Sequence, residues 1–269
     1  MIVAENLEVS YRQRREPVLN GVNAIFDGKS LILGPNGSGK TTLFRAICGL
    51  TNITKGRILV DNVNVKEIYA KTGIISVNFP EVLSLLSVKV HDLIKLYADL
   101  ADGDSSTAYK ILGELGLTNK LLRSKKLHEL SAGQVKAVCT AIALSMRAKH
   151  VLLDEPFEQL DPARKHVLIK YLEDYDGIIV LNTHETWLLR KLAGWKVFFM
   201  FEGVLYGSIL AEDLLKAKLS LKDEPKALIK MKVSGKPVSL IKGRKKGTPI
   251  LSLESLDKVY ELALEAEKS

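Results

Sequence analysis

The stretch Gly34-Pro35-Asn36-Gly37-Ser38-Gly39-Lys40-Thr41-Thr42 decides the fold of this 269-residue chain. It contains the pattern G-x-x-x-x-G-K-[ST], follows a strand predicted over Ser30–Leu33 and opens a helix predicted over Thr41–Gly49. Glycines let successive backbone N–H groups curl around phosphate oxygens, and the helix N-terminus adds positive charge. Lys40 suits the β- and γ-phosphates, and the Thr41 hydroxyl suits Mg²⁺. We therefore predict that residues 34–42, here called the phosphate turn, bind a nucleoside triphosphate.

Composition excludes several classes of protein. The chain is 46% hydrophobic and 26% charged, which is typical of a soluble globular protein and argues against disorder. No apolar stretch approaches the roughly 20 residues of a membrane span, and the interrupted run Val197–Ala211 is predicted to be a hairpin. No secretory signal is visible after Met1. Cys48 and Cys139 lie in apolar runs and are predicted to be buried free thiols in a reducing compartment.

A second acidic motif stands at the end of a predicted strand. The apolar run Val151–Leu153 leads directly into Asp154 and Glu155. Residues at the carboxyl end of a buried parallel strand emerge in the ligand crevice of an α/β sheet. There Asp154 can hold Mg²⁺, and Glu155 can orient or deprotonate an attacking water. The two acids and the phosphate turn together predict a hydrolytic nucleotide site.

A third motif, Leu130-Ser131-Ala132-Gly133-Gln134, begins a helix predicted over Val135–Met146 with Ser131 as its N-cap. Here the sequence resembles the ABC ATPase family, whose signature is LSGGQ. The resemblance spans about residues 1–210. It implies that Tyr11 stacks on adenine, that Asp161 lies in the D-loop and that His184 contacts the γ-phosphate and the attacking water.

The resemblance also implies the architecture and the mechanism. We expect a P-loop α/β core with an N-terminal antiparallel β subdomain and a helical insertion, the whole spanning residues 1–218. The helical subdomain covers about residues 79–130. Two such ATPases would close head to tail, so that Ser131 and Gly133 of one face the γ-phosphate held by the other. Glu155 would be the general base, and ATP with Mg²⁺ would join the closed dimer.

A small basic α+β module is predicted over residues 219–269. Strands are expected over 227–233, 238–241 and 250–253, followed by a helix from Ser255 to Glu267 that Ser255 caps. Eleven Lys or Arg residues against two acids lie between Lys216 and Gly247. This basic segment is either a solvated surface or a surface that is attracted to anionic lipid headgroups. No aromatic residue lies between Tyr206 and Tyr260, so nucleic-acid binding is not expected.

The chain departs from the family at several positions. The family's glutamine between core and helical insertion is replaced by Asn78, which we hypothesise reaches Mg²⁺ through a water. No register restores the glutamine, because the chain contains only Gln13, Gln134 and Gln159. Ala132 replaces a signature glycine, and Ala137 and Ile142 stand where many relatives carry arginine.

The resemblance leaves the partner and the substrate open. The chain is predicted to be the ATP-hydrolysing subunit of a multi-subunit ABC transporter, cytoplasmic and peripheral at the inner face of the membrane. Its partners would be an integral membrane permease and a second copy of itself or a homologous subunit. The likeness of Leu253–Tyr260 to C-terminal extensions of export ATPases slightly favours export. The alternatives are a soluble ABC ATPase serving an assembly such as iron–sulfur cluster biogenesis, and a nucleotide-gated binding module without turnover.

Overall fold

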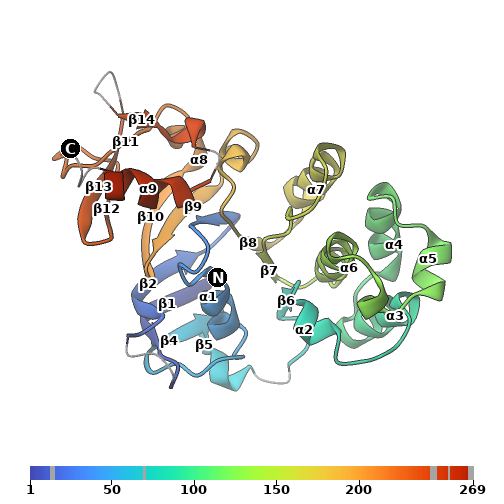
Figure 1. The fold of residues 1–269 in the computed structure, drawn as a ribbon. Helices are drawn as coiled ribbons and strands as arrows, with labels where there is room; N and C mark the ends of the chain where they lie inside the picture. Colours follow the sequence, from blue (N-terminus) through green and yellow to red (C-terminus); the bar gives the residue numbers. More distant parts are fainter. Residues whose placement is uncertain (13–15, 69–70, 243–246, 254, 266–269) are drawn as a thin grey trace. The chain divides into compact units, whose positions relative to one another are not determined.

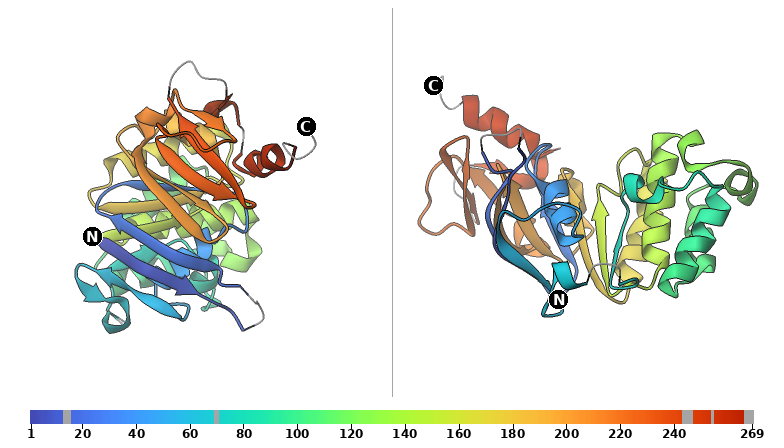
Figure 2. Two further views of the ribbon diagram at one scale, coloured as in Figure 1. Left: turned by 90° about the vertical axis from the view of Figure 1, so that its left-hand side faces the viewer. Right: turned by 90° about the horizontal axis from the view of Figure 1, so that it is seen from below.

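The computed structural model describes residues 1–12, 16–68, 71–242, 247–253 and 255–265. The chain divides into two compact units. The first contains Met1–Glu67 and Asn182–Ser269, and the second contains Ile68–Leu181. The boundary falls inside strand β8 (Ile178–Thr183), all of whose side chains are buried. Figures 1 and 2 show the chain from three sides.

The first unit begins with an antiparallel sheet in the order β2-β1-β4-β5. Its strands are β1 (Ile2–Val9), β2 (Leu19–Phe26), β4 (Lys55–Val60) and β5 (Val63–Asn64). Along β1, buried and more exposed residues largely alternate, as expected for a sheet with one covered face. Ile2 pairs with Phe26 on one side and with Val60 on the other, and all three side chains are buried. The N-terminal β subdomain is thus present.

The phosphate turn joins strand β3 (Ser30–Leu33) to helix α1 (Lys40–Ile47). Strand β3 pairs in parallel with β9 (Lys196–Phe201), which pairs antiparallel with β10 (Val204–Leu210). The predicted hairpin over residues 197–211 is therefore correct. Short helical segments complete this part of the unit: η1 (Val65–Glu67), η3 (Thr186–Arg190) and α8 (Ala211–Leu214).

The C-terminal residues of the first unit form a separate sheet in the order β12-β13-β11-β14. Its strands are β11 (Lys218–Ser220), β12 (Ile229–Val233), β13 (Lys236–Ile241) and β14 (Thr248–Pro249), followed by η4 (Ile250–Ser252) and α9 (Asp257–Glu265). The strand expected over 250–253 is wrong, because the Leu253 N–H donates to the Ile250 carbonyl and closes a tight turn. Arg244, Lys245, Lys246 and the predicted helix end at 266–267 lie outside the described residues.

The second unit is mostly helical. Its helices are α2 (Pro80–Leu83), α3 (Val90–Ala101), α4 (Ser105–Glu114), α5 (Asn119–Ser124), η2 (Leu127–Glu129), α6 (Ala132–Ser145) and α7 (Pro162–Asp174). Helix α6 is the centre, because α2, α3, α4 and both strands β6 (Ile75–Val77) and β7 (His150–Asp154) pack on it. Its residues 137–145 are all buried. A helical insertion is thus present, as expected, and its predicted bounds at residues 79–130 stay a prediction.

The chain buries a substantial core in each unit. Cys139 is buried and Cys48 is partly buried, and both are free thiols, as predicted. Burial raises the pKa of each thiol to about 12, so neither ionises at neutral pH. Among the described residues, no helix combines the length and hydropathy that a bilayer crossing requires.

Candidate nucleotide site

The phosphate turn is held by its neighbours in the first unit. The Gly34 N–H donates to the carbonyl of Thr183, the last residue of β8, at 3.1 Å. A Cβ on Gly34 would lie 2.5 Å from the Met200 carbonyl oxygen and 2.8 Å from Ser38 Oγ, so only glycine fits. Gly37 and Gly39 have φ angles of 77° and 109°, which side chains rarely adopt. The glycines of the pattern therefore hold a backbone that other residues would distort.

The Lys40 side chain lies within the curve of the phosphate turn. Its side chain is buried, and Nζ donates to the carbonyl oxygens of Gly34 at 2.7 Å and Pro35 at 3.0 Å. The Ser38 hydroxyl is buried as well and has no hydrogen-bond partner in the structure. A buried cation and an unpartnered hydroxyl in a curled backbone are suited to receive phosphate oxygens.

Helix α1 begins without a side-chain cap. Its N-cap is Gly39, no side chain accepts from the first turn, and that turn contains no acidic residue. Thr41 and Thr42 stand in this first turn, half-buried. A positive helix end without an acid of its own favours an anionic ligand.

Tyr11 interacts with two residues of α1, Thr42 and Arg45. Burial raises the pKa of its hydroxyl, but hydrogen bonds with Thr51 and Thr42 and the nearby Arg45 charge outweigh this and hold the pKa below its ordinary value. Its side chain is 38% exposed. A partly exposed aromatic ring beside Thr42 of the phosphate turn is suited to stack on a nucleotide base.

Two residues at the start of the C-terminal helix, Leu256 just before it and Asp257 within it, contact predicted site residues. The Asn36 N–H of the phosphate turn donates to Asp257 Oδ1 at 3.2 Å. The carbonyl oxygen of His184, directly after β8, accepts from the Leu256 N–H at 3.3 Å. The sequence gives no signal for either contact, because each joins residues more than 70 positions apart.

In the second unit, Asp154 stands at the end of β7 and is fixed through its backbone. The Asp154 N–H donates to Asn78 Oδ1 at 2.7 Å, and Asn78 Nδ2 donates to the Asp154 carbonyl at 3.3 Å. Asn78 Nδ2 also donates to Thr140 Oγ1 at 3.1 Å, and Lys136 Nζ donates to the Asp154 carbonyl at 3.0 Å. Asn78 is fully buried. It therefore continues the pairing of β6 with β7 by its side chain and ties both to helix α6.

Glu155 follows with an unusual backbone. Its φ angle is 45°, in the left-handed region that side chains other than glycine rarely occupy. Eight other described non-glycine residues also have positive φ angles, so the angle by itself does not mark a functional residue. Glu155 is half-buried and lies directly after β7, whose first four residues are buried. The predicted base is thus held in a strained backbone position.

The Ser131 motif begins α6 with a reciprocal cap. Gln134 Oε1 accepts from the Ser131 N–H at 3.0 Å, and Ser131 Oγ accepts from the Gln134 N–H at 3.4 Å. Ser131 is exposed. A Cβ on Gly133 would lie 3.2 Å from the Gln159 carbonyl, so glycine lets the two segments approach. Asp161 caps α7 in a similar way, accepting from the Arg164 N–H at 3.0 Å.

The predicted residues thus fall into two groups. The first unit brings together the phosphate turn, Tyr11 and His184, and the second unit brings together Asn78, Asp154 and the start of α6, with Asp161 on α7. Sequence reasoning missed Asp257, Lys136 and Thr140. Their spacing on the predicted helix could have placed Lys136 and Thr140 on one face, since they are four positions apart.

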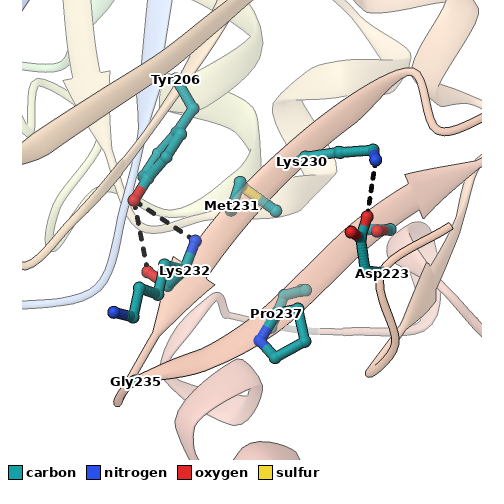
Figure 3. Close-up of a pocket in the computed structure, with 9 residues that line it drawn as sticks. Tyr206, Asp223, Lys230, Met231, Lys232, Gly235 and Pro237 are labelled. Atoms are coloured by element: carbon teal, nitrogen blue, oxygen red, sulfur yellow. Dashed lines mark hydrogen bonds and ion pairs between the residues drawn. The ribbon is translucent and has the colours of Figure 1, made fainter. Parts of the chain in front are cut away.

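A separate pocket lies in the C-terminal sheet, away from these motifs in sequence (Figure 3). It has a volume of about 410 Å³ and is lined mainly by β12 and β13. Lys230 pairs with Asp223 at 2.6 Å across it, and the Tyr206 hydroxyl contacts the backbone of Lys232. These groups satisfy one another, so this pocket is not a candidate catalytic site.

Comparison with known proteins identifies relatives along most of the chain. The family model described as ABC transporter matches residues 26–158. The energy-coupling factor transporter ATP-binding protein EcfA of Methanocaldococcus jannaschii is 31% identical over 204 residues, which cover 69% of this chain and 71% of that protein. The EcfA protein of Methanoculleus marisnigri is 29% identical over 233 residues, covering 80% and 83%.

Solved structures that match the chain are also named as ATP-binding proteins or parts of transporters. A crystal structure of a chain named for cobalt transport, the ATP-binding protein cbiO-2, matches with a TM-score of 0.89 and 35% identity, covering 97% of this chain and 100% of that one. The structure of cbiO1 from Clostridium perfringens, described as part of the ABC transporter complex cbiONQ, matches with a TM-score of 0.59 and 27% identity, covering 79% and 89%. The first match includes the C-terminal sheet, since it covers nearly the whole chain.

Proposed function

We propose that this chain works by closing head to tail on a second ATPase subunit around ATP. The chain belongs to the family of ABC transporter ATP-binding proteins and is an ATPase subunit of a multi-subunit transporter. The observation that carries the proposal is the phosphate turn, with its buried lysine and its uncapped helix. The second subunit is another copy of this chain or a homologous one.

ATP binding uses the groups of the first unit. The backbone N–H groups of the phosphate turn and Lys40 Nζ hold the phosphates, and Lys40 would exchange its carbonyl partners for phosphate oxygens. The Tyr11 ring stacks on the base. His184 contacts the γ-phosphate from the end of β8.

Mg²⁺ fits the oxygen donors present. The Thr41 hydroxyl and the Asp154 carboxylate are hard oxygen ligands of the kind Mg²⁺ takes together with water and phosphate oxygens. When bound, the ion neutralises charge on the β- and γ-phosphates. Asn78 fixes the backbone of Asp154 and so positions that carboxylate, and the water-mediated contact between Asn78 and the ion stays a prediction.

Hydrolysis depends on positioning rather than on covalent chemistry. Glu155 accepts a proton from the attacking water, which then adds to the γ-phosphorus as the bond to the β–γ bridging oxygen breaks. In the closed dimer, the exposed Ser131 of one subunit and its neighbour Gly133 face the γ-phosphate bound by the other. ATP thus joins the two subunits, and hydrolysis to ADP and phosphate releases them.

The transporter context follows from the relatives. They are named as energy-coupling factor and cobalt transport subunits, which supports a role in transport. These names give no direction of transport, and the slight preference for export from the C-terminal likeness stays a prediction. We propose a cytoplasmic location at the inner face of the membrane, beside a separate permease. Leu85 and Leu86, which are 79% and 45% exposed after α2, offer an apolar surface for that partner. A soluble assembly ATPase is disfavoured, because these relatives are transporter subunits.

The variant Glu155→Gln tests the proposal. We expect ATP hydrolysis to fall at least about 100-fold while ATP binding persists, since only the proton acceptor changes. Light scattering after gel filtration should then find a dimer with ATP and Mg²⁺ and a monomer without nucleotide. The double variant Glu155→Gln with Ser131→Arg should stay monomeric with ATP. A Glu155→Gln protein that remains monomeric at saturating ATP, with any homologous subunit supplied, contradicts the proposal.

A further inference from the structure

Leu253 and residues 255–260, here called the C-terminal segment, contact the residues that follow β8 and the phosphate turn. The Thr186 hydroxyl donates to the Leu253 carbonyl, and Ser255 forms an antiparallel bridge with Glu185. The Tyr260 ring meets the Phe201 ring edge-on, with centroids 5.9 Å apart. These contacts hold the start of α9 against the residues that follow His184 and against the end of β9. All of these residues belong to the first unit.

Asp257 is the residue that this anchoring brings to the phosphate turn. Its Oδ1 accepts from the Asn36 N–H at 3.2 Å. Its Oδ2 accepts from the Ser255 hydroxyl at 2.5 Å, and Ser255 Oγ accepts from the Asp257 N–H at 3.2 Å. The carboxylate is therefore oriented by its own helix start and directed at a backbone donor of the turn. A carboxylate oxygen on such a donor takes the place that an anionic phosphate oxygen would take.

We propose that Asp257 competes with the nucleotide for the phosphate turn, so that the C-terminal segment sets the affinity of this subunit for ATP and ADP. A carboxylate and a polyphosphate repel each other at this distance, so binding of phosphate displaces Asp257 from Asn36. The coupling is reciprocal. Contacts that stabilise the docked C-terminal segment lower the affinity for nucleotide. Bound nucleotide in turn weakens the contacts of that segment beside His184.

This inference rests on the proposed function, because it assumes that nucleotide binds at the phosphate turn. The test is a titration of the full chain with a fluorescent ATP analogue, for the wild type, Asp257→Asn and Asp257→Ala. Removal of the carboxylate should tighten ATP and ADP binding about three- to tenfold, the scale of one exposed hydrogen bond to a charged group. The matched control is Glu261→Gln, which removes the same charge one turn further along α9 at an exposed position and should leave affinity unchanged.

A second ligand separates competition from a general loosening of the fold. Adenosine carries no phosphate, so its affinity should be the same in all four proteins. Hydrogen exchange should show that the amides of residues 255–260 lose protection when ADP binds to the wild type. Equal nucleotide affinity in Asp257→Asn and wild type, or an equal gain for adenosine, overturns this inference alone. Failure of every protein to bind nucleotide overturns the proposed function instead.

Discussion

The helix that follows the phosphate turn begins without a side-chain cap, whereas α4, α6 and α7 of the second unit each begin with one. Asp104 accepts from the Ser106 N–H, Ser131 from Gln134 and Asp161 from Arg164. In α1 the equivalent position is Gly39, with no side-chain acceptor. Helices α2 and α3 of the second unit also lack a side-chain cap, but each carries an acidic residue in its first turn, Glu81 and Asp92. Helix α1 has neither a cap nor an acid there, so its N-terminus is the one best suited to an anionic ligand.

Removal of the Lys40 charge should have the largest effect, because it takes away the group that makes the start of α1 a site for phosphate. Lys40→Met keeps the buried aliphatic stem but removes the cation that lies within the turn. ATP affinity should fall roughly 100- to 1,000-fold, because charge-assisted contacts to phosphate are among the strongest hydrogen bonds. Lys120→Met, on the exposed face of α5, is the control for loss of one lysine. Isothermal titration with ATP and Mg²⁺ measures both. A Lys40→Met protein with wild-type affinity would show that the turn does not receive the phosphates.

The Asn78 bridge is the corresponding test in the second unit. Asn78→Ala removes three hydrogen bonds and leaves the Asp154 N–H and Thr140 Oγ1 without this partner in a buried region. We expect a loss of about 3 kcal/mol in the free energy of unfolding, measured by urea denaturation. The Mg²⁺ concentration for half-maximal hydrolysis should rise, because the carboxylate of Asp154 is no longer positioned. Ser124→Ala, an exposed hydroxyl in the same unit, should change neither quantity. An unchanged free energy of unfolding together with a higher Mg²⁺ concentration for half-maximal hydrolysis would instead support a contact between Asn78 and the ion through a water.

Glycine substitutions sharpen the comparison further. Gly34→Ala places a Cβ 2.5 Å from the Met200 carbonyl and should destabilise the fold by about 2 kcal/mol. Gly133→Ala, at the start of α6, meets the Gln159 carbonyl at 3.2 Å, and its better helix propensity offsets part of that cost. Its effect should stay below about 1 kcal/mol. Gly28→Ala, where nothing lies within 4 Å, is the neutral control. Equal melting temperatures for Gly34→Ala and Gly28→Ala would contradict the close packing of the turn.

The smallest effect concerns the cap of α4 and depends on pH. Hydrogen bonds from Ser106 and Thr107 lower the pKa of Asp104 to about 2. A depressed carboxylate pKa adds stability above the unfolded value of about 3.9, and this is lost as pH falls toward 2. The difference in urea midpoint between wild type and Asp104→Ala should therefore shrink between pH 4 and pH 2 and stay constant from pH 5 to 7. A difference that stays constant down to pH 2 would show that the cap acts without its charge.

Much of the fold and of the site was predictable because the decisive contacts are local. The phosphate turn, β3, the hairpin β9–β10 and the cap at Ser131 each depend on residues within a few positions of one another. The turn at Ile250 was not predictable, since an apolar run after Pro249 is equally typical of a strand. The roles of Asn78 and Asp257 depend on contacts with residues 76 and 221 positions away, and no local pattern encodes them.

The left-handed backbone at Glu155 sets a limit on how robust this enzyme can become. Every side chain placed there meets a backbone cost on the order of 1 kcal/mol, and only glycine avoids it. With Glu155 in the proposed role of base, Glu155→Gly should raise the melting temperature and abolish ATP turnover. Under the proposed mechanism, the carboxylate at this position outweighs its backbone cost, and the chain gives up that stability for turnover.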